Sequence, residues 1–269
     1  MNAKTDIYGI IGNPINKSFS PALHTKMFKK YHINAVYAPF ESDNIKDALI
    51  GLKGLSIKGV NITLPYKEKA FSLIDQADED AQILKSVNTI KNVNGKLYGY
   101  NTDFKGFMEA LKNNFNYKEK NITLIGAGGA ARGVIYALYK LGIREINVMN
   151  RTISRAENLQ KEFLDLIKIN VCGLNAKKTV GDSDMIINAT SVGLKNSNMP
   201  IDIKNVEKSD IIDIIYPDTE LIKQAKLKGL RTMNGVEMFI NQAFYSFKIW
   251  TGIEFDRKAA LNVMKDFYR

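Results

Sequence analysis

Short runs of apolar, β-branched residues alternate along this chain with segments in which apolar residues recur every three or four positions. In the first hundred residues the runs that predict strands are residues 6–12, 35–41, 59–64, 87–92 and 96–100. A second series comprises residues 121–126, 145–150, 184–190 and 210–216. Strands that alternate with helices are typical of an α/β fold.

Turn chemistry and helical spacing support this assignment in particular segments. Residues 93–95 read VNG and separate two strand candidates, and Asn-Gly is the strongest short signal for a β-hairpin. Residues 21–31 bring Leu23, Met27 and Tyr31 to one face of a predicted helix. The first hundred residues therefore contain both paired strands and covering helices.

The end of the chain predicts two amphipathic helices, residues 236–250 and 256–268. They follow the second series of strands, and we expect them to pack back on the first domain. The whole pattern predicts two α/β domains. Residues 1–101, completed by residues 238–269, form the first, and residues 102–237 form the second.

Composition bounds the class of protein. The hydrophobic share of 45% and the charged share of 25% are those of an ordinary soluble protein. The N-terminal sequence MNAKTDIYGIIG does not resemble a signal peptide, and no apolar stretch is long enough to span a bilayer. The single cysteine, Cys172, excludes an internal disulfide framework and favours the cytoplasm. No Cys and His cluster has metal-ligand spacing, so no metal is expected.

The net charge of +10 raises the question of a nucleic-acid partner. The lysines are scattered along helix faces, as in KQAKLKG at residues 223–229, without a basic tract or interleaved aromatic residues. We therefore interpret the charge as a solvated, lysine-rich surface. Neither nucleic acid nor a membrane is an expected partner, and a small anionic substrate remains compatible with the charge.

A glycine-rich loop opens the second series. Residues 121–138 read NITLIGAGGAARGVIYAL, in which Gly126, Gly128 and Ala131 match the dinucleotide-binding fingerprint between a strand and a helix. Gly126 permits the tight turn, Gly128 lets the backbone approach a pyrophosphate, and Ala131 lets the helix lie close to the strand. A tight turn without a ligand is the alternative. The strand before and the helix after favour a Rossmann-type dinucleotide-binding domain.

The next strand ends in NRTISR, residues 150–155, about twenty positions beyond the glycines. An acid here would bind the ribose 2′-hydroxyl of NAD, whereas this chain has Arg151 and Arg155. Guanidinium groups form bidentate, charge-assisted bonds with phosphate. Two solvated arginines at a helix start are the alternative, which the positive helix N-terminus disfavours. The pattern predicts NADP as the cofactor.

Three polar loops of the first domain have plain structural interpretations when each is taken alone. Ser20 before Pro21 is typical of a helix N-cap, although this leaves Ser18 without a role, and two hydroxyls at a helix start could also hold a carboxylate. Lys67 would be a surface lysine in the first turn of a helix. Asp103 would be the N-cap of the helix that follows it.

Together, these loops belong to an ordered set of motifs that spans essentially the whole chain. The motifs are Ser18-Phe19-Ser20-Pro21, Asn61-Ile62-Thr63-Leu64-Pro65-Tyr66-Lys67, Val87-Asn88-Thr89, Asn101-Thr102-Asp103, Gly126-Ala127-Gly128-Gly129-Ala130-Ala131, Asn150-Arg151-Thr152 with Arg155, Asn188-Ala189-Thr190-Ser191, Tyr216-Pro217, and Gly235, Met238 and Gln242 at their mutual spacing. This set resembles the shikimate dehydrogenase family. The resemblance implies NADP-linked reduction of 3-dehydroshikimate to shikimate, a step of chorismate and aromatic amino-acid biosynthesis.

The resemblance also implies roles for individual positions. The residues implied to bind the substrate are Ser18, Ser20 and Tyr216 for its carboxylate, and Thr63, Asn88, Asp103 and Gln242 for its ring hydroxyls. Lys67 would lie beside the reacting oxygen. The residues implied to bind or line NADP are Gly126, Ala127, Gly128, Gly129, Ala130, Ala131, Asn150, Arg151, Thr152, Arg155, Thr190, Gly235 and Met238.

This assignment is coherent with hydride-transfer chemistry, in which the substrate oxygen must gain or lose a proton as the ring carbon gains or loses hydride. A lysine and an aspartate around one oxygen can serve this need. We interpret Lys67 as the proton donor and acceptor, and Asp103 as the group that orients Lys67 and the substrate.

Two other functions remain open on the same fold. A dual quinate/shikimate dehydrogenase shares most of the motifs, although a form that uses NAD is expected to place an acid at Arg151. A non-catalytic NADP-binding sensor would need the glycine loop alone, and the presence of both Lys67 and Asp103 disfavours it. The family contains both monomers and homodimers, so either assembly is expected.

Overall fold

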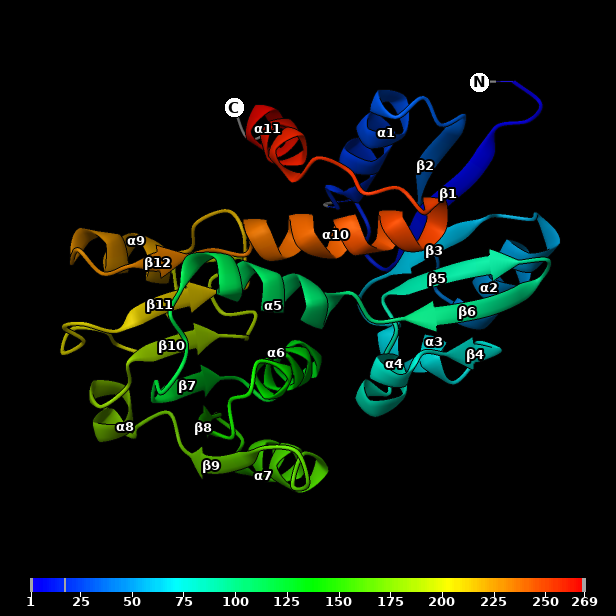
Figure 1. The fold of residues 1–269 in the computed structure, drawn as a ribbon. Coiled ribbons are helices and arrows are strands. Elements are labelled where there is room, and N and C mark those ends of the chain that lie inside the picture. Colours follow the sequence, from blue (N-terminus) through cyan, green and yellow to red (C-terminus); the bar gives the residue numbers. More distant parts are fainter. Residues whose placement is uncertain (1, 17, 268–269) are drawn as a thin grey trace. The chain divides into compact units, whose positions relative to one another are not determined.

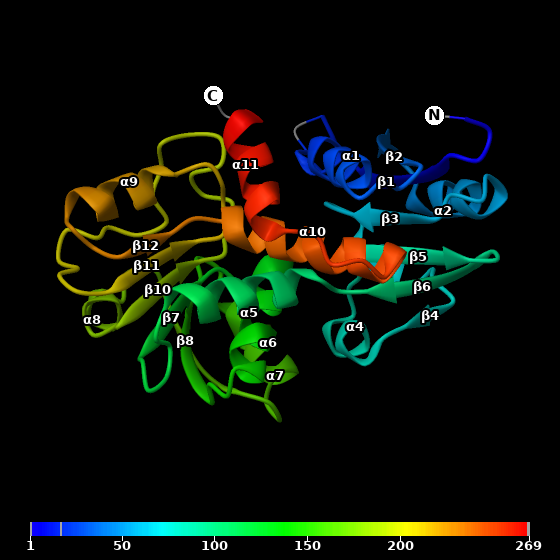
Figure 2. The same cartoon turned by 45° about the horizontal axis from the view of Figure 1, so that its top comes forward.

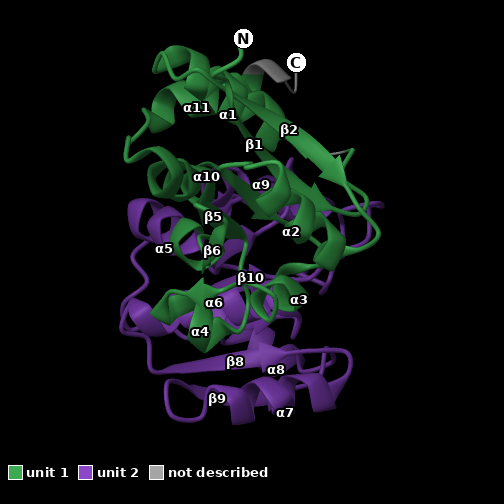
Figure 3. Ribbon diagram, turned by 90° about the vertical axis from the view of Figure 1, so that its right-hand side faces the viewer, with its two compact units in different colours: residues 1–106, 240–269 green, residues 107–239 purple. Residues whose placement is uncertain are grey.

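The computed structural model describes residues 2–16 and 18–267, which form two compact units. Unit 1 comprises residues 1–106 and 240–269, and unit 2 comprises residues 107–239 (Figure 3). The division points lie within helices α5 (Asp103–Asn114) and α10 (Val236–Thr251) rather than in linkers. None of the described helices is long and apolar enough to cross a lipid bilayer.

Unit 1 is built on a mixed sheet of six described strands in the order β2-β1-β3-β5-β6-β4 (Figure 1). The strands are β1 (Asp6–Gly12), β2 (Ala35–Glu41), β3 (Gly59–Ile62), β4 (Gln76–Ala77), β5 (Thr89–Val93) and β6 (Lys96–Tyr100). β1 pairs in parallel with β2 and β3, and β5 is antiparallel to both β3 and β6. The predicted hairpin is confirmed: Asn94 and Gly95 both have positive φ, 52° and 81°, as a type I′ turn requires.

Helices α1 (Ser20–Lys30), α2 (Ile45–Gly54), α3 (Lys67–Phe71), α4 (Glu79–Leu84) and α11 (Arg257–Phe267) complete unit 1 together with the last turns of α10. α2 presents Ile45, Leu49 and Leu52 to the sheet core. α11 lies against α1, so the end of the chain packs back on the first unit as expected (Figure 2). Tyr268, the last residue of the predicted helix 256–268, lies outside the described residues.

Side-chain hydrogen bonds attach the end of α10 to the sheet of unit 1. Trp250 Nε1 donates to the Ile90 carbonyl at 3.0 Å, and Lys91 Nζ donates to the Ile249 carbonyl at 2.7 Å. A methyl group at Gly59 would lie 2.4 Å from Trp250 Nε1 and 2.8 Å from the Ile90 oxygen. Glycine at position 59 therefore lets the indole reach the strand.

Unit 2 is built on a parallel sheet of six described strands in the order β12-β11-β10-β7-β8-β9. The strands are β7 (Ile122–Ile125), β8 (Glu145–Met149), β9 (Lys168–Cys172), β10 (Met185–Asn188), β11 (Asp210–Asp213) and β12 (Thr232–Met233). The helices that accompany them are α6 (Gly129–Lys140), α7 (Ile153–Glu162), α8 (Lys177–Gly181) and α9 (Glu220–Leu227). Counted along the unit, the order is 3-2-1-4-5-6, that of a Rossmann fold, which confirms the predicted fold class.

Some predicted strands run past the observed ones. The run 59–64 ends as a strand at Ile62, 87–92 begins at Thr89, and 210–216 ends at Asp213. In each case the excess residues lie at a loop whose backbone bonds to side chains or to another segment. Strand β9 was absent from the candidates because KINVC is short and only partly buried. β4 and β12 have two residues each, too few for a periodic signal.

An aromatic cluster in the core of unit 1 encloses His24. The imidazole stacks on the Tyr37 ring at 4.6 Å between centroids and lies 5.3 Å from Trp250. His24 is fully buried, and neither ring nitrogen has a hydrogen-bond partner among the described residues. Burial lowers the pKa of His24 to about 3, so the ring is neutral at physiological pH.

His24 is expected to make the protein sensitive to acid. Its folded-state pKa lies below the ordinary value of 6.5, so the unfolded chain binds the extra proton below pH 6.5 and stability falls as pH falls from about 6.5 toward 3. This component amounts to about 1.4 kcal/mol per pH unit at its steepest. Urea unfolding at pH 7 and pH 5 should show that His24→Phe removes it. His32→Asn, which removes the other, exposed histidine, is the control, and an unchanged pH dependence in His24→Phe would contradict this role.

Candidate active site

Four loops leave the sheet of unit 1 at one edge. β1, β3 and β6 end there, and β5 begins there because it runs antiparallel to its neighbours. Asn61 and Tyr100, near the ends of β3 and β6, both pair with Thr89 at the start of β5. The predicted residues that these loops carry are Ser18, Thr63, Lys67, Asn88 and Asp103.

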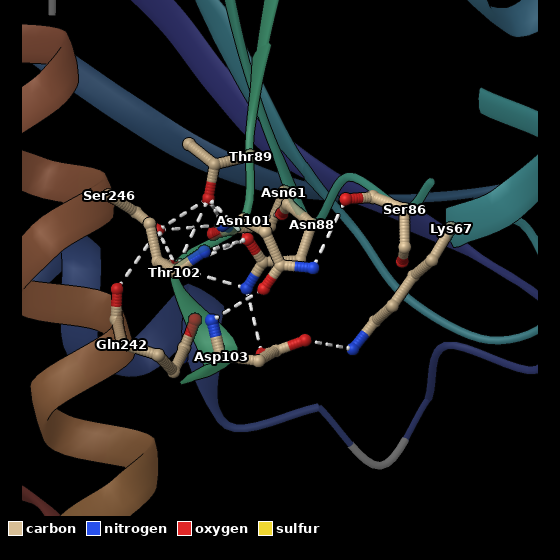
Figure 4. Close-up of polar contacts among 10 residues, drawn as sticks. All are labelled: Asn61, Lys67, Ser86, Asn88, Thr89, Asn101, Thr102, Asp103, Gln242 and Ser246. Carbon is tan, nitrogen blue, oxygen red and sulfur yellow. Dashed lines mark hydrogen bonds and ion pairs between the residues drawn. The ribbon is translucent and has the colours of Figure 1, made fainter. Parts of the chain in front are cut away.

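Lys67 and Asp103 form an ion pair at this edge. Lys67 is the first residue of α3, as the sequence predicts, and its Nζ lies 2.6 Å from Asp103 Oδ2 (Figure 4). The two side chains are 29% and 23% exposed, so a ligand can reach both. The pair is therefore close enough for a strong charge-assisted hydrogen bond and open enough to act on a bound molecule.

Asp103 is not the N-cap of α5, contrary to the structural interpretation of its position. It is the first residue of the helix, and Asn101 Oδ1 accepts its backbone N–H at 3.1 Å. This leaves the Asp103 carboxylate available: one oxygen binds Lys67, and the other accepts from Asn88 Nδ2 at 2.8 Å. Asn101 provides the local cap, so the acid is held by other groups.

Asn88 is the centre of the buried polar network behind this pair. Its Nδ2 also donates to Thr102 Oγ1 at 2.9 Å, and its Oδ1 accepts the Thr102 N–H at 2.7 Å and the Thr89 hydroxyl at 3.0 Å. Asn88 is 3% exposed. A buried amide with all its hydrogen bonds made has one stable orientation, so Asn88 fixes the carboxylate that it holds.

The network continues to α10 through Ser246. Asn61 Nδ2 lies 3.0 Å from Ser246 Oγ and 3.1 Å from Thr89 Oγ1, and Tyr37 donates to Asn61 Oδ1 at 2.7 Å. Ser246 in turn donates to the Gln242 carbonyl at 3.0 Å (Figure 4). Gln242, one of the predicted substrate residues, therefore joins this network through its backbone carbonyl.

Sequence reasoning assigned no role to four residues of this network: Asn61, Thr89, Thr102 and Ser246. Three stand within the quoted motifs, and a polar residue at the end of a buried strand signals such a function. Ser246 lies four residues after Gln242 on one helix face, where i and i+4 side chains are neighbours. A serine among the apolar residues of a buried helix face is the sequence feature that could have indicated this role.

The two serines of the first loop differ in their surroundings. The interpretation of Ser20 as an N-cap is wrong, because α1 begins at Ser20, Phe19 occupies the capping position, and Pro21 follows in the first turn. Ser18 Oγ instead accepts the Ser20 N–H at 3.3 Å. Ser20 is buried and its hydroxyl bonds to Tyr37, whereas Ser18 is partly exposed.

Thr63, another predicted substrate residue, lies in the loop between β3 and α3. It is partly exposed, and its backbone N–H donates to the Ile11 carbonyl at 2.9 Å. A methyl group at Gly12 would lie 2.3 Å from Thr63 Cγ2, so glycine at position 12 leaves room for this threonine.

The glycine loop of unit 2 has the geometry that a dinucleotide needs. Gly126 has φ +112°, in the left-handed region, and a methyl group there would lie 2.9 Å from Thr190 Cγ2. Gly128 precedes α6, and no side chain caps that helix. Apart from Gly128 and its two chain neighbours, no described residue has an atom within 4 Å of the place that a Gly128 methyl group would take. Ala131 is fully buried in the first turn of α6. The free N–H groups of α6 and this open space fit a pyrophosphate.

Of the other residues of the loop, Ala127 is partly exposed, and Gly129 and Ala130 are exposed at the start of α6. The carboxyl ends of β7 and β10 lie side by side here, at the point where the strand order reverses. In Rossmann folds this switch point is where ligands bind.

The segment after β8 presents two cations at the start of α7. Arg151 and Arg155 are exposed, and the first turn of α7 contains no acidic residue. Asn150 Nδ2 donates to the Thr152 carbonyl at 2.8 Å, which shapes the turn into the helix. These residues fit a cofactor that carries an additional phosphate on its ribose.

The remaining predicted residues of unit 2 lie near the carboxyl ends of β10, β11 and β12. Thr190 donates its N–H and hydroxyl to Asn188 Oδ1 at 3.0 and 2.7 Å. The Tyr216 ring lies 5.2 Å from that of Phe239. The other two predicted residues are the buried Gly235 and the partly buried Met238. Tyr216 belongs to unit 2, whereas the other predicted substrate residues belong to unit 1. No group of three or more His, Cys, Asp or Glu among the described residues is arranged to hold a metal ion.

Comparison with known proteins matches three family models along the chain. These are the shikimate dehydrogenase substrate binding domain at residues 10–90, shikimate / quinate 5-dehydrogenase at residues 109–233, and the shikimate 5′-dehydrogenase C-terminal domain at residues 235–265. The shikimate dehydrogenase (NADP(+)) of Aquifex aeolicus is 39% identical over 272 residues, which cover 99% of this chain and 98% of that protein.

Solved structures of similar proteins agree over nearly the full length. A shikimate dehydrogenase in complex with NADP+ is 38% identical, with a TM-score of 0.92, over 99% of this chain and 96% of the other. Quinate dehydrogenase from Corynebacterium glutamicum in complex with NAD is 28% identical, with a TM-score of 0.91, over 97% of this chain and 99% of the other.

Asn88 offers a direct test of the buried network. Asn88→Ala should lower the free energy of unfolding by about 1–3 kcal/mol or more, because it leaves the Thr102 N–H and one Asp103 oxygen without their partner. Asn158→Ala, an exposed substitution in α7, should change it by less than about 0.5 kcal/mol. Urea denaturation followed by circular dichroism compares them, and equal midpoints would show that the Asn88 bonds contribute nothing.

Proposed function

The chain belongs to the shikimate dehydrogenase family, a family of oxidoreductases, and from this premise we propose that it catalyses the reversible NADP-dependent reduction of 3-dehydroshikimate to shikimate. The observation that carries the proposal is the partly exposed Lys67–Asp103 pair, 2.6 Å apart, held from behind by Asn88. A sensor that only bound the cofactor would not need such a pair. The proposed role is a step of chorismate and aromatic amino-acid biosynthesis in the cytoplasm.

The proposed division of labour follows the two-domain prediction. Residues 1–101, completed by residues 238–269, are proposed to provide most of the substrate site, to which Asp103 and Tyr216 are added, and residues 102–237 are proposed to bind NADP with Met238 at the boundary. Either a monomer or a homodimer is compatible with this division.

The Lys67 ammonium is proposed to handle the proton of the reaction. When bound, NADPH supplies the hydride that the carbonyl carbon of 3-dehydroshikimate accepts. Lys67 Nζ donates a proton to the oxygen of that carbonyl group, which becomes the hydroxyl of shikimate. In the reverse direction Lys67 takes the proton back. Asp103 keeps the ammonium in place, and Asn88 keeps the carboxylate in place.

The substrate carboxylate is proposed to bind at Ser18 and Ser20, with help from Tyr216. Ser18 is the more accessible of the two serines, because the Ser20 hydroxyl bonds to Tyr37 in the interior. Ser20 would contact a carboxylate only after its hydroxyl turned away from Tyr37. The ring hydroxyls are proposed to bind at Thr63, Asn88, Asp103 and Gln242.

NADP is proposed to bind at the glycine loop and the arginines of unit 2. The pyrophosphate would lie on the free N–H groups of α6, and the 2′-phosphate on Arg151 and Arg155. Asn150 and Thr152 would shape the adenosine side, and Thr190, Gly235 and Met238 the nicotinamide side.

A dual quinate/shikimate dehydrogenase is the second candidate, and the similarity to a solved quinate dehydrogenase favours its consideration. Formation of reduced nicotinamide, with shikimate or quinate crossed against NADP or NAD, separates the candidates. Turnover of shikimate with NADP alone is the expected result. Comparable rates with quinate would support the dual enzyme, and NADP binding without turnover of either substrate would support a sensor.

Lys67→Ala should lower kcat by about 10²–10⁴-fold, because no other group takes over its proton transfer. Lys69→Ala, an exposed substitution in the same helix, is the matched control and should leave kcat unchanged. Steady-state rates with shikimate and NADP measure both. If Lys67→Ala raised KM for shikimate but kept kcat, Lys67 would be a binding residue and not the proton donor.

Arg151→Ala should weaken NADP binding by about 1–3 kcal/mol and leave NAD binding nearly unchanged. Arg144→Ala is the matched control. Arg144 lies before β8, at the opposite end of the strand from Arg151, and its guanidinium donates to the Tyr139 carbonyl at 3.1 Å. Calorimetric titration with each nucleotide provides the affinities. An equal loss for NADP and NAD would assign Arg151 a structural role.

A further inference from the structure

Asp213 is a fully buried carboxyl group that none of the roles described so far uses. It is the last residue of β11 and is 0% exposed. Its Oδ1 accepts the Ile215 N–H at 3.0 Å, and its Oδ2 accepts the Thr219 hydroxyl at 2.7 Å. The Asn188 side chain also bonds to it. Three donors from two segments therefore converge on one carboxyl group.

Burial of this carboxyl group is costly. Burial raises the pKa of Asp213, and the bonds from Ile215, Thr219 and Asn188 oppose that rise. A packed apolar side chain of similar size would avoid the cost of desolvation. The acid is therefore explained better by the geometry that it imposes on its partners than by the stability that it contributes.

One of these partners, Asn188, connects Asp213 with Thr190, which is proposed to line the NADP site. Asn188 on β10 is the register partner of Asp213 on β11, and its side chain bonds to that acid. Asn188 Nδ2 also lies 3.5 Å from the Val192 carbonyl oxygen. Asn188 Oδ1 faces Thr190 and accepts hydrogen bonds from its N–H and its hydroxyl. Thr190 Cγ2 then lies against Gly126, where a methyl group would come within 2.9 Å of it. Asp213 is therefore connected with Gly126 of the glycine loop through Asn188 and Thr190.

The other two partners lie in the segment after β11. The Ile215 and Thr219 bonds close residues 213–219 into a turn that contains Tyr216. The Ile215 carbonyl accepts the Gly235 N–H at 2.9 Å, and a methyl group at Gly235 would lie 2.1 Å from the Ile214 oxygen. A displacement of this turn would therefore move the main chain at Gly235.

We propose that Asp213 is a positioning residue for NADP, which holds Thr190 through Asn188 and holds the Gly235 main chain through the turn at residues 213–219. This inference rests on the proposed NADP site. Asp213 itself does not contact the cofactor in this role. Its effect passes through residues whose positions depend on its two oxygens accepting hydrogen bonds.

Asp213→Asn tests the proposal, because it keeps the size of the side chain and replaces one acceptor by a donor that faces the donors of Ile215, Thr219 or Asn188. The affinity for NADP, measured by calorimetric titration, should fall about tenfold or more. Asp210→Asn is the matched control: Asp210 is the first residue of the same strand, where it pairs with Lys120. It should keep the parent affinity within about twofold, whatever its effect on the melting temperature.

The outcomes separate positioning from stability. An unchanged affinity in Asp213→Asn, or an equal loss in both variants, would overturn the proposal, since a purely structural acid would shift the melting temperature and not the affinity of the folded protein. If Asp213→Asn does not fold, Thr219→Val, which removes one donor to the acid, should still weaken NADP binding severalfold. A parent protein that failed to bind NADP at all would overturn the proposed function itself, whereas normal parent binding with an unaffected Asp213→Asn would overturn this inference alone.

Discussion

A buried side-chain amide is stable only when all its hydrogen bonds are made, and the site in unit 1 depends on this constraint at Asn88 and Asn61. Asn88 needs the loop before α5 for two of its bonds, and Asn61 needs Ser246 of α10 and Tyr37 of β2. The amides are therefore satisfied only when segments from both ends of the chain are in place. Placement of the Asp103 carboxylate follows from that requirement.

Unit 2 applies the same constraint with different partners. Asn188 ends β10 as Asn61 nearly ends β3, and its amide is satisfied by a buried acid on the next strand and by the backbone of its own loop. In both units a polar residue at the end of a buried strand organises the loop that follows. The strand holds the backbone of the amide residue in place, and the hydrogen bonds of the amide then fix the conformation of the loop.

Much of the fold could be read from the sequence because its signals are local. The alternation of strands and helices, the Asn94-Gly95 turn and the glycine loop each depend on residues adjacent in the chain. β9 was missed because its short run is only partly buried, and the ends of β3 and β11 were misplaced because the apolar runs continue into the loops that follow these strands. The local apolar pattern does not show where the strand pairing stops.

The site divides in the same way. Lys67 and Asp103 could be proposed as a pair from the motifs, and the pairing of β3, β5 and β6 explains how two residues 36 positions apart in the chain come together. The roles of Ser246 and Asp213 could not be predicted, because a serine in an apolar helix and an acid in an apolar strand become meaningful only when their neighbours in space are known. The assignment of Ser20 as an N-cap failed because α1 begins at Ser20 itself, so that Phe19 occupies the capping position.

The contact between Gly59 and Trp250 has a spectroscopic consequence. Trp250 is the single tryptophan of the chain, and its indole is buried in unit 1 with its N–H bonded to the Ile90 carbonyl. Emission excited selectively from tryptophan therefore reports on one unit and is silent about the other. The protein therefore carries a natural optical label that follows the unfolding of unit 1 without any added dye.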